Sequence, residues 1–110
     1  MNEAADIKQL LIQTADEMFM RLGIKSVSMD DIARQLGVSK KTIYQVVDNK
    51  KELLSLVIEE DACKDKEVIA ENREQSRDAI DEFLRNSRYF IRQMREISPA
   101  TMRDLQKYYP

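Results

Sequence analysis

The chain has 110 residues, a formal net charge of −2, and 35% Asp, Glu, Lys and Arg. Two glycines and two prolines leave little room for the turns of β-sheets, so we expect an all-α chain built from amphipathic helices. Histidine is absent, one cysteine cannot build a zinc site, and the sequence has no glycine-rich phosphate loop or hydrolase motif. We therefore expect a protein that is not an enzyme and that needs no metal or cofactor.

The single cysteine, Cys63, excludes an internal disulfide and agrees with a reducing cytoplasm. A packing or surface position is favoured over a redox-sensing thiol. No apolar run approaches the length of a membrane span, and the acidic N-terminus lacks a signal-peptide pattern. These features predict a cytoplasmic protein without a membrane segment.

The first predicted helix covers residues 3–22 and ends at Gly23. Its apolar residues recur every three or four positions, as one buried helix face requires: Ile7, Leu11, Ala15, Met18 and Leu22. The connector that follows is expected to place Ile24 and Val27 between the helices.

Residues 28–54 have the pattern of two short helices separated by a tight turn. Ser28 is placed to cap the first of them, with Asp31 completing a capping-box-like pair. Gly37 supplies the backbone freedom that a sharp helix end needs, and Ser39 is placed to cap the second helix. One apolar face holds this first helix to the core: Ile32, Ala33 and Leu36.

The second short helix, predicted over residues 40–46, points Ile43 and Val47 inward. Its outward face carries cations, a hydroxyl, an amide and an aromatic ring: Lys40, Lys41, Thr42, Tyr44 and Gln45. These groups suit contacts to phosphates and base edges. Residues 39–51 hold four lysines against one aspartate, a local charge of +3, which leaves −5 for the rest of the chain. A basic patch on an acidic body is typical of a DNA-binding module joined to a part that does not touch DNA.

The fourth helix is predicted over residues 51–72, after a turn at residues 48–50. Lys50 and Lys51 then lie at a helix N-terminus, where the helix dipole favours anions, so we expect Lys50 to meet a phosphate. The buried side of this helix is expected to carry Leu53, Leu54, Val57, Ile58, Ala62 and Ile69.

A fifth helix is predicted over residues 77–97 with Ser76 as its cap, and a sixth begins at Ser98 and Pro99. The fifth helix is expected to bury a stripe of Ile80, Phe83, Leu84, Ser87, Ile91 and Met94. Four arginines form a ladder along it: Arg85, Arg88, Arg92 and Arg95. We interpret this ladder as a solvated face with ion pairs rather than a ligand surface, with Asp81 paired to Arg85.

The chain resembles the N-terminal part of the tetracycline-repressor (TetR) family of bacterial transcriptional regulators over roughly residues 5–55, with the most specific motifs in residues 28–54. The matching residues are Ile32-Ala33, Leu36-Gly37-Val38-Ser39-Lys40, Thr42-Ile43-Tyr44, Lys50 and Glu52-Leu53. The family often carries an aromatic-rich run after the tyrosine, where this chain has Gln45-Val46-Val47, so the resemblance does not extend to the operator sequence.

The resemblance implies roles for individual residues. The set that looks like phosphate contacts is Ser28, Ser39, Thr42, Tyr44 and Lys50. The set that looks like base readers is Lys40, Lys41 and Gln45, since lysine donates to guanine and glutamine pairs with adenine.

The family resemblance also implies a three-helix DNA-binding head in residues 1–50, followed in residues 51–110 by the first helices of an effector-binding and dimerisation domain. Members are usually nearly twice as long, so we expect the chain to be truncated and the homodimer to form through C-terminal helices absent from it. The implied function is that of a sequence-specific regulator of a double-stranded DNA operator, a repressor released by a small-molecule effector. The alternative is a helical protein-interaction module that has lost DNA binding, against which Lys40 and Lys41 argue.

Overall fold

The structure is a computed structural model that describes residues 3–108, and every regular element in that range is a helix. The elements are α1 (Glu3–Leu22), α2 (Met29–Leu36), α3 (Lys40–Tyr44), α4 (Lys50–Gln75), α5 (Ala79–Glu96) and α6 (Pro99–Tyr108). The all-α expectation is therefore confirmed.

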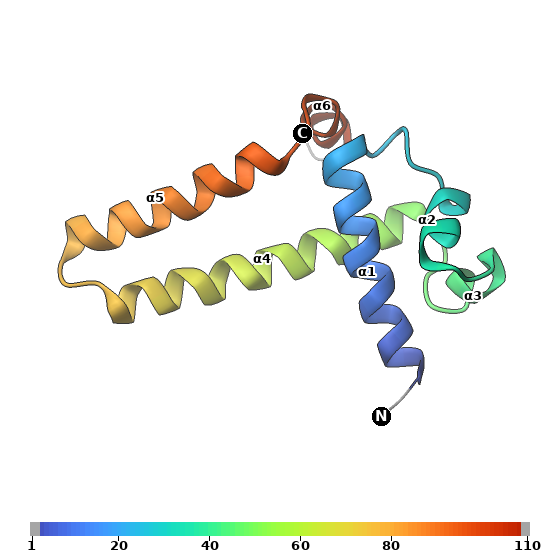
Figure 1. Cartoon of the computed structure of the whole chain (residues 1–110), viewed down its shortest axis with the longest axis horizontal. Helices are drawn as coiled ribbons and strands as arrows, with labels where there is room; N and C mark the ends of the chain where they lie inside the picture. The colour runs from blue at the N-terminus through green and yellow to red at the C-terminus, as the bar shows by residue number, and fades with distance from the viewer. Residues whose placement is uncertain (1–2, 109–110) are drawn as a thin grey trace.

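The six helices form a small head with a long helical hairpin attached to it (Figure 1). In the head, α1 crosses the first part of α4 and packs against α2, which carries α3. The rest of α4 leaves the head and pairs with α5, which returns antiparallel to it. Helix α6 then packs against the C-terminal part of α1, so the chain comes back to the head.

Short-range hydrogen bonds fix the ends of α2 and α3 as the sequence predicts. The Ser28 Oγ accepts from the Asp31 N–H at 3.0 Å, and the Asp31 carboxylate accepts from the Ser28 N–H at 2.9 Å, which completes the capping box. Gly37 ends α2 in the left-handed region with φ of +75°, where a side chain would be strained. Ser39 caps α3 by accepting from the Thr42 N–H at 3.2 Å.

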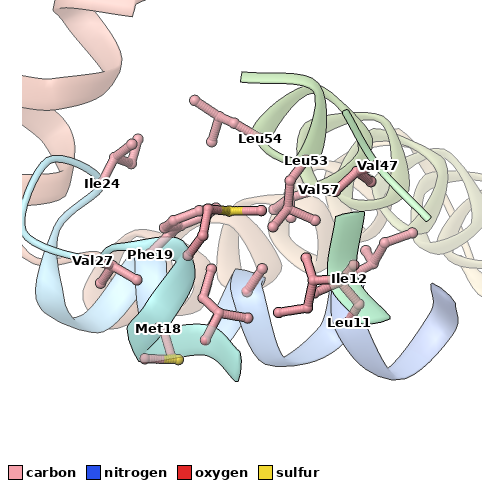
Figure 2. Close-up of a cluster of buried hydrophobic side chains, with 14 of the residues drawn as sticks. Leu11, Ile12, Met18, Phe19, Ile24, Val27, Val47, Leu53, Leu54 and Val57 are labelled. Carbon is pink, nitrogen blue, oxygen red and sulfur yellow. The ribbon is translucent and has the colours of Figure 1, made fainter. Parts of the chain in front are cut away.

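One hydrophobic core joins α1, α2, α3 and the start of α4 (Figure 2). Phe19 lies at its centre and is fully buried, as are Ile43 of α3 and Leu53 of α4. The predicted inward residues Ile24, Val27 and Val47 are buried too. The core holds α3 in place despite its five residues, because Ile43 and Val47 anchor it on either side of its C-terminal end.

The boundaries of α3, α4 and α5 differ from the sequence predictions. Helix α3 ends at Tyr44 rather than residue 46, and α4 runs from Lys50 to Gln75 rather than over residues 51–72. Ser76 does not cap α5: its hydroxyl donates to the Asn72 carbonyl and ends α4. Asp78 is the cap, accepting from the Asp81 N–H at 2.8 Å, since a carboxylate is favourable at a helix N-terminus.

The predicted buried stripe of α5 is wrong for this chain. No residue of α5 is buried, and Ile80, Phe83 and Met94 are 72%, 69% and 62% exposed. Leu84 and Ile91 are exposed too, as are Ala62 and Ile69 on the outer part of α4. The cause is the architecture: the hairpin extends away from the head, so within the described residues the outer part of each of its helices has only the other helix beside it.

The charged residues of the hairpin behave as expected. Arg85 pairs with Asp81 at 3.2 Å, one turn earlier, while Arg88, Arg92 and Arg95 are exposed. Cys63 lies on the surface of α4. No helix within residues 3–108 is long and apolar enough to cross a membrane.

Candidate nucleic-acid interface

The exposed face of α3 is the basic surface that the sequence predicts. Lys40, Lys41, Tyr44 and Gln45 are all exposed, while Ile43 between them is fully buried. The helix therefore presents two ammonium groups, a phenol and an amide on one side and is fixed to the core by the other. These groups can donate to phosphates and to base edges without competing with the packing of the head.

Two of the predicted phosphate contacts, Ser39 and Thr42, lie together at the N-terminus of α3. Their hydroxyls are 3.0 Å apart, and Thr42 is half-buried where Ser39 is exposed. Since Ser39 also caps the helix, its hydroxyl is held in a fixed direction at the edge of the basic surface.

Lys40 is already paired within the head. Its Nζ lies 3.5 Å from the Oδ1 of Asp30 on α2, and both side chains are largely exposed. An exposed pair of this kind contributes little stability, so DNA can displace the carboxylate at small cost. Asp30 was not among the predicted site residues, although its place beside Asp31 and close to the basic stretch was the available signal.

Ser28 and Lys50 lie apart from the α3 group and are linked to each other through Asp31. The hydrogen bond from the Ser28 N–H lowers the pKa of the Asp31 carboxyl, so an anion already occupies the N-terminus of α2. Lys50 is half-buried, with its Nζ 5.8 Å from the centre of the Phe19 ring. Burial lowers the pKa of the Lys50 ammonium, while the carboxylates of Asp104 and Asp31 oppose that change.

The predicted site residues thus fall into two groups. Six lie on or at the ends of α3 and form one surface: Ser39, Lys40, Lys41, Thr42, Tyr44 and Gln45. Ser28 and Lys50 lie at the first turns of α2 and α4. Asp104 of α6, whose charge favours the charged form of Lys50, was not predicted as part of the site. No local sequence pattern indicates it, because it is far from the head in the sequence and reaches it only when α6 packs there.

A cavity of about 1140 Å³ lies on the other side of the head, between α1, α4, α5 and α6. Its lining combines apolar and aromatic side chains with more carboxylates than cations. Asp16 and Asp61 both line this cavity, and burial together with the neighbouring Asp61 carboxyl raises the pKa of Asp16 to about 7. The Tyr89 hydroxyl donates to Asp65 at 2.7 Å, and this bond raises the pKa of Tyr89 to about 12.

The raised pKa of Asp16 makes the stability of the head depend on pH. The folded state holds a proton on Asp16 up to about pH 7, whereas the unfolded chain loses it near 3.8, so stability falls as the pH rises between these values. Asp16→Asn removes this loss. Because the side chain is only half-buried, we expect a gain of about 1–2 kcal/mol at alkaline pH and little change in acid.

Urea unfolding on both sides of neutrality measures this gain. Glu74→Gln, an exposed acid near the far end of α4, serves as the control that removes one charge elsewhere. If the free energies of unfolding of the wild type and Asp16→Asn change with pH in the same way, then Asp16 does not carry the proton.

The capped helix pair, with a buried inner face and a basic outer face on its second helix, defines a helix-turn-helix DNA-binding protein. Residues 11–57 match the family described as bacterial regulatory proteins, tetR family. This part of the chain matches the N-terminal DNA-binding domain of the TetR family, which is a family of transcriptional regulators rather than enzymes.

Curated relatives agree with this assignment. Over 56 residues the chain is 34% identical to the HTH-type transcriptional regulator SrpR of Pseudomonas putida, covering 51% of this chain and 26% of that protein. The chain is also 34% identical over 56 residues to the uncharacterized HTH-type transcriptional regulator TtgW of Pseudomonas putida, covering 51% of this chain and 42% of that protein. Over 48 residues it is 40% identical to the uncharacterized HTH-type transcriptional regulator YhgD of Bacillus subtilis, covering 44% of this chain and 25% of that protein.

The matched part of the chain therefore spans between a quarter and about two fifths of the length of these relatives. No solved structure matches the chain significantly.

Proposed function

We propose that this chain is the DNA-binding part of a homodimeric repressor that leaves its operator when a small-molecule effector binds. The observation that carries the proposal is the outer face of α3, where Lys40, Lys41, Tyr44 and Gln45 are exposed on a helix fixed to the core by Ile43. A basic helix held in this way can enter the major groove of a duplex.

Within this proposal, Lys40, Lys41 and Gln45 read bases, and Ser28, Ser39, Thr42, Tyr44 and Lys50 contact phosphates. The α3 residues are supported by their common exposed surface. Lys50 has to turn away from the Phe19 ring to reach a phosphate, and Ser28 shares its N–H with Asp31.

We also propose that residues 1–50 form the head and that residues 51–110 begin the effector and dimer domain. Two heads in a dimer occupy half-sites about one DNA turn apart. If each head makes about four phosphate contacts, the logarithm of the binding constant of the dimer falls against the logarithm of salt concentration with a slope near −7.

The cavity between α1, α4, α5 and α6 supports an effector site next to the helix that connects head and hairpin. Five carboxylates line it against two cations, and Tyr89 and Phe90 supply aromatic surface. A small organic cation with an apolar body is therefore the favoured ligand. An effector seated there would rearrange α4, change the separation of the two heads and so weaken binding to successive major grooves.

Lys50→Ala tests the DNA-binding proposal. We expect weaker binding to every DNA sequence to a similar degree, with a salt slope smaller by about 0.9, because a phosphate contact carries no sequence information. Fluorescence anisotropy with labelled duplexes measures both quantities. Lys66→Ala, an exposed lysine in the middle of α4, is the matched control and should bind as the wild type does. Equal binding of every sequence by wild type, with no loss in Lys50→Ala, would overturn the proposal.

A further inference from the structure

Helix α5 carries an apolar stripe on a side that does not contact α4. The side that faces α4 is marked by Asn86, which accepts from the Asn72 amide at 2.9 Å, and by Tyr89, which donates to Asp65. The stripe beside it repeats at alternating spacings of four and three residues, with a small residue in the middle: Ile80, Leu84, Ser87, Ile91 and Met94. Phe83 and Phe90 lie along one edge of the stripe. This repeat is typical of a helix face that packs lengthwise against another helix.

The stripe is large enough to be an interface. Its apolar side chains are all exposed, and Phe90 and Met94 at its C-terminal end also border the cavity. At about 200 Å² for a fully exposed large side chain, the exposed fractions leave on the order of 600 Å² of apolar surface on this helix. A contiguous apolar patch of that size on a single chain marks an interaction site. Two such stripes packed together would cover roughly 1,200 Å², the lower end of specific protein interfaces.

A row of charges runs along the other edge of the stripe. Asp81, Arg88 and Arg95 are spaced seven residues apart, so they lie in line on the helix. Arg88 and Arg95 are exposed and have no salt bridge within residues 3–108. Asp81 accepts from the Arg77 N–H and from Arg85 through one oxygen, Oδ2, which leaves Oδ1 for a further cation. The row is therefore acidic at the N-terminal end of α5 and basic at the C-terminal end.

Such a row complements itself only when two copies of α5 run antiparallel. In that arrangement Asp81 of each helix meets Arg88 or Arg95 of the other, whereas parallel helices would bring like charges together. Ser87 then lies near the twofold axis, where a small side chain lets the two helices approach closely. A surface that pairs with itself about a twofold axis is the usual form of a homodimer contact.

We propose that the apolar stripe of α5 is a homodimer contact, in which two copies of this chain pack antiparallel and Asp81 of each copy pairs with the arginines of the other. The inference rests on the proposed function in taking the DNA-binding form to be a homodimer, and it names a surface for it within the described residues. This surface differs from the C-terminal helices that the family resemblance implies. Its modest area predicts a dissociation constant in the micromolar range. Well below that concentration the chain is a monomer and α5 stays exposed.

Analytical ultracentrifugation of the chain over a range of concentrations tests the contact. We expect the mass to rise from that of one chain to that of two. Ile91→Glu should weaken dimerisation by at least about tenfold, because it buries an unpaired carboxylate from each copy in the interface. Ile91 is 52% exposed in the single chain, so the variant should keep its fold, which circular dichroism checks. Leu10→Glu is the matched control, since Leu10 is 53% exposed on α1 and lies outside the stripe, and it should dimerise as the wild type does.

A charge exchange tests the antiparallel direction. One variant carries Arg88→Glu and Arg95→Glu, which makes the row acidic throughout, and the other carries Asp81→Arg, which makes it basic throughout. Each variant alone should be monomeric at concentrations where the wild type is a dimer, because its row meets like charges. An equal mixture of the two should dimerise again, since every charge then meets its opposite. The N–H of residue 81, which Asp78 caps, is kept in the second variant, so α5 keeps its N-terminal cap.

The outcomes separate this inference from the proposed function. A wild-type chain that stays monomeric at every concentration, or an Ile91→Glu protein that dimerises as tightly as wild type, would overturn the inference while leaving DNA binding by the head intact. Two folded charge variants that fail to associate when mixed would overturn it as well. A wild-type chain that binds no DNA at low ionic strength would overturn the proposed function and leave the α5 contact standing.

Discussion

Phe19→Ala is expected to remove about 3–5 kcal/mol from the free energy of unfolding, a large share of the stability of a small domain. The ring is fully buried in the core that joins α1, α2, α3 and the start of α4. Truncation leaves a cavity that these helices cannot close by moving together, because the Phe19 and Met20 carbonyls stay bonded to α6. The ammonium of Lys50 also loses the aromatic face that it lies over.

Urea unfolding followed by circular dichroism measures the change, and the chain supplies a matched control. Phe83→Ala deletes the same atoms from a residue that is 69% exposed on α5, so it should change stability by less than about 0.5 kcal/mol. Phe19→Leu, which keeps most of the volume, should fall between the two. Similar losses for Phe19→Ala and Phe83→Ala would show that the core is not organised around Phe19.

The features that the sequence predicted well are those with local causes. The capping box of Ser28 and Asp31, the left-handed end at Gly37 and the cap at Ser39 each depend on residues within one turn of each other. The same holds for Ser98 and Pro99 at the start of α6, where the Ser98 Oγ accepts from the Thr101 N–H. Local hydrogen bonding and backbone geometry suffice to determine such ends.

Burial along the hairpin was predicted badly because periodicity shows which side of a helix is apolar but not whether anything covers it. Ile80 and Phe83 repeat at helical spacing, yet both are largely exposed in this chain. The predicted start of α5 was wrong for a different reason. Ser76 and Asp78 are both residue types that favour the N-cap position, and Asp78 occupies it because its carboxylate accepts from the Asp81 N–H.

In the candidate site, too, the part with local causes was predicted and the part that depends on distant residues was not. The outward face of α3 followed from residue spacing, since Ile43 and Val47 had to face the core. The surroundings of Lys50 did not follow, because Asp104 comes from a helix far along the chain and reaches the loop after α1 only when α6 docks. Long-range electrostatic partners of this kind leave no pattern in neighbouring residues.

The second large effect is expected at the positions of α3 that we propose read bases. Gln45 and Lys41 are exposed and have no salt bridge within the described residues, whereas Lys40 shares its charge with Asp30. We therefore expect Gln45→Ala and Lys41→Ala to cost about 1–3 kcal/mol each on the preferred operator. Gln45 is uncharged and ends α3 through its main chain, so Gln45→Ala should leave both folding and binding to mixed-sequence DNA nearly unchanged.

Selection of bound duplexes from a random pool, followed by sequencing, measures the preference of each variant. Gln45→Ala should relax the preference at one base position in each half-site, because a glutamine amide pairs bidentately with adenine and alanine cannot. Lys41→Ala should relax a different position and also weaken binding to all DNA, since it removes a charge as well as a donor. Gln93→Ala on α5 removes the same amide outside the head and should select the wild-type sequences. If Gln45→Ala also selects the wild-type sequences, then the amide reads no base, and α3 holds the duplex by charge alone.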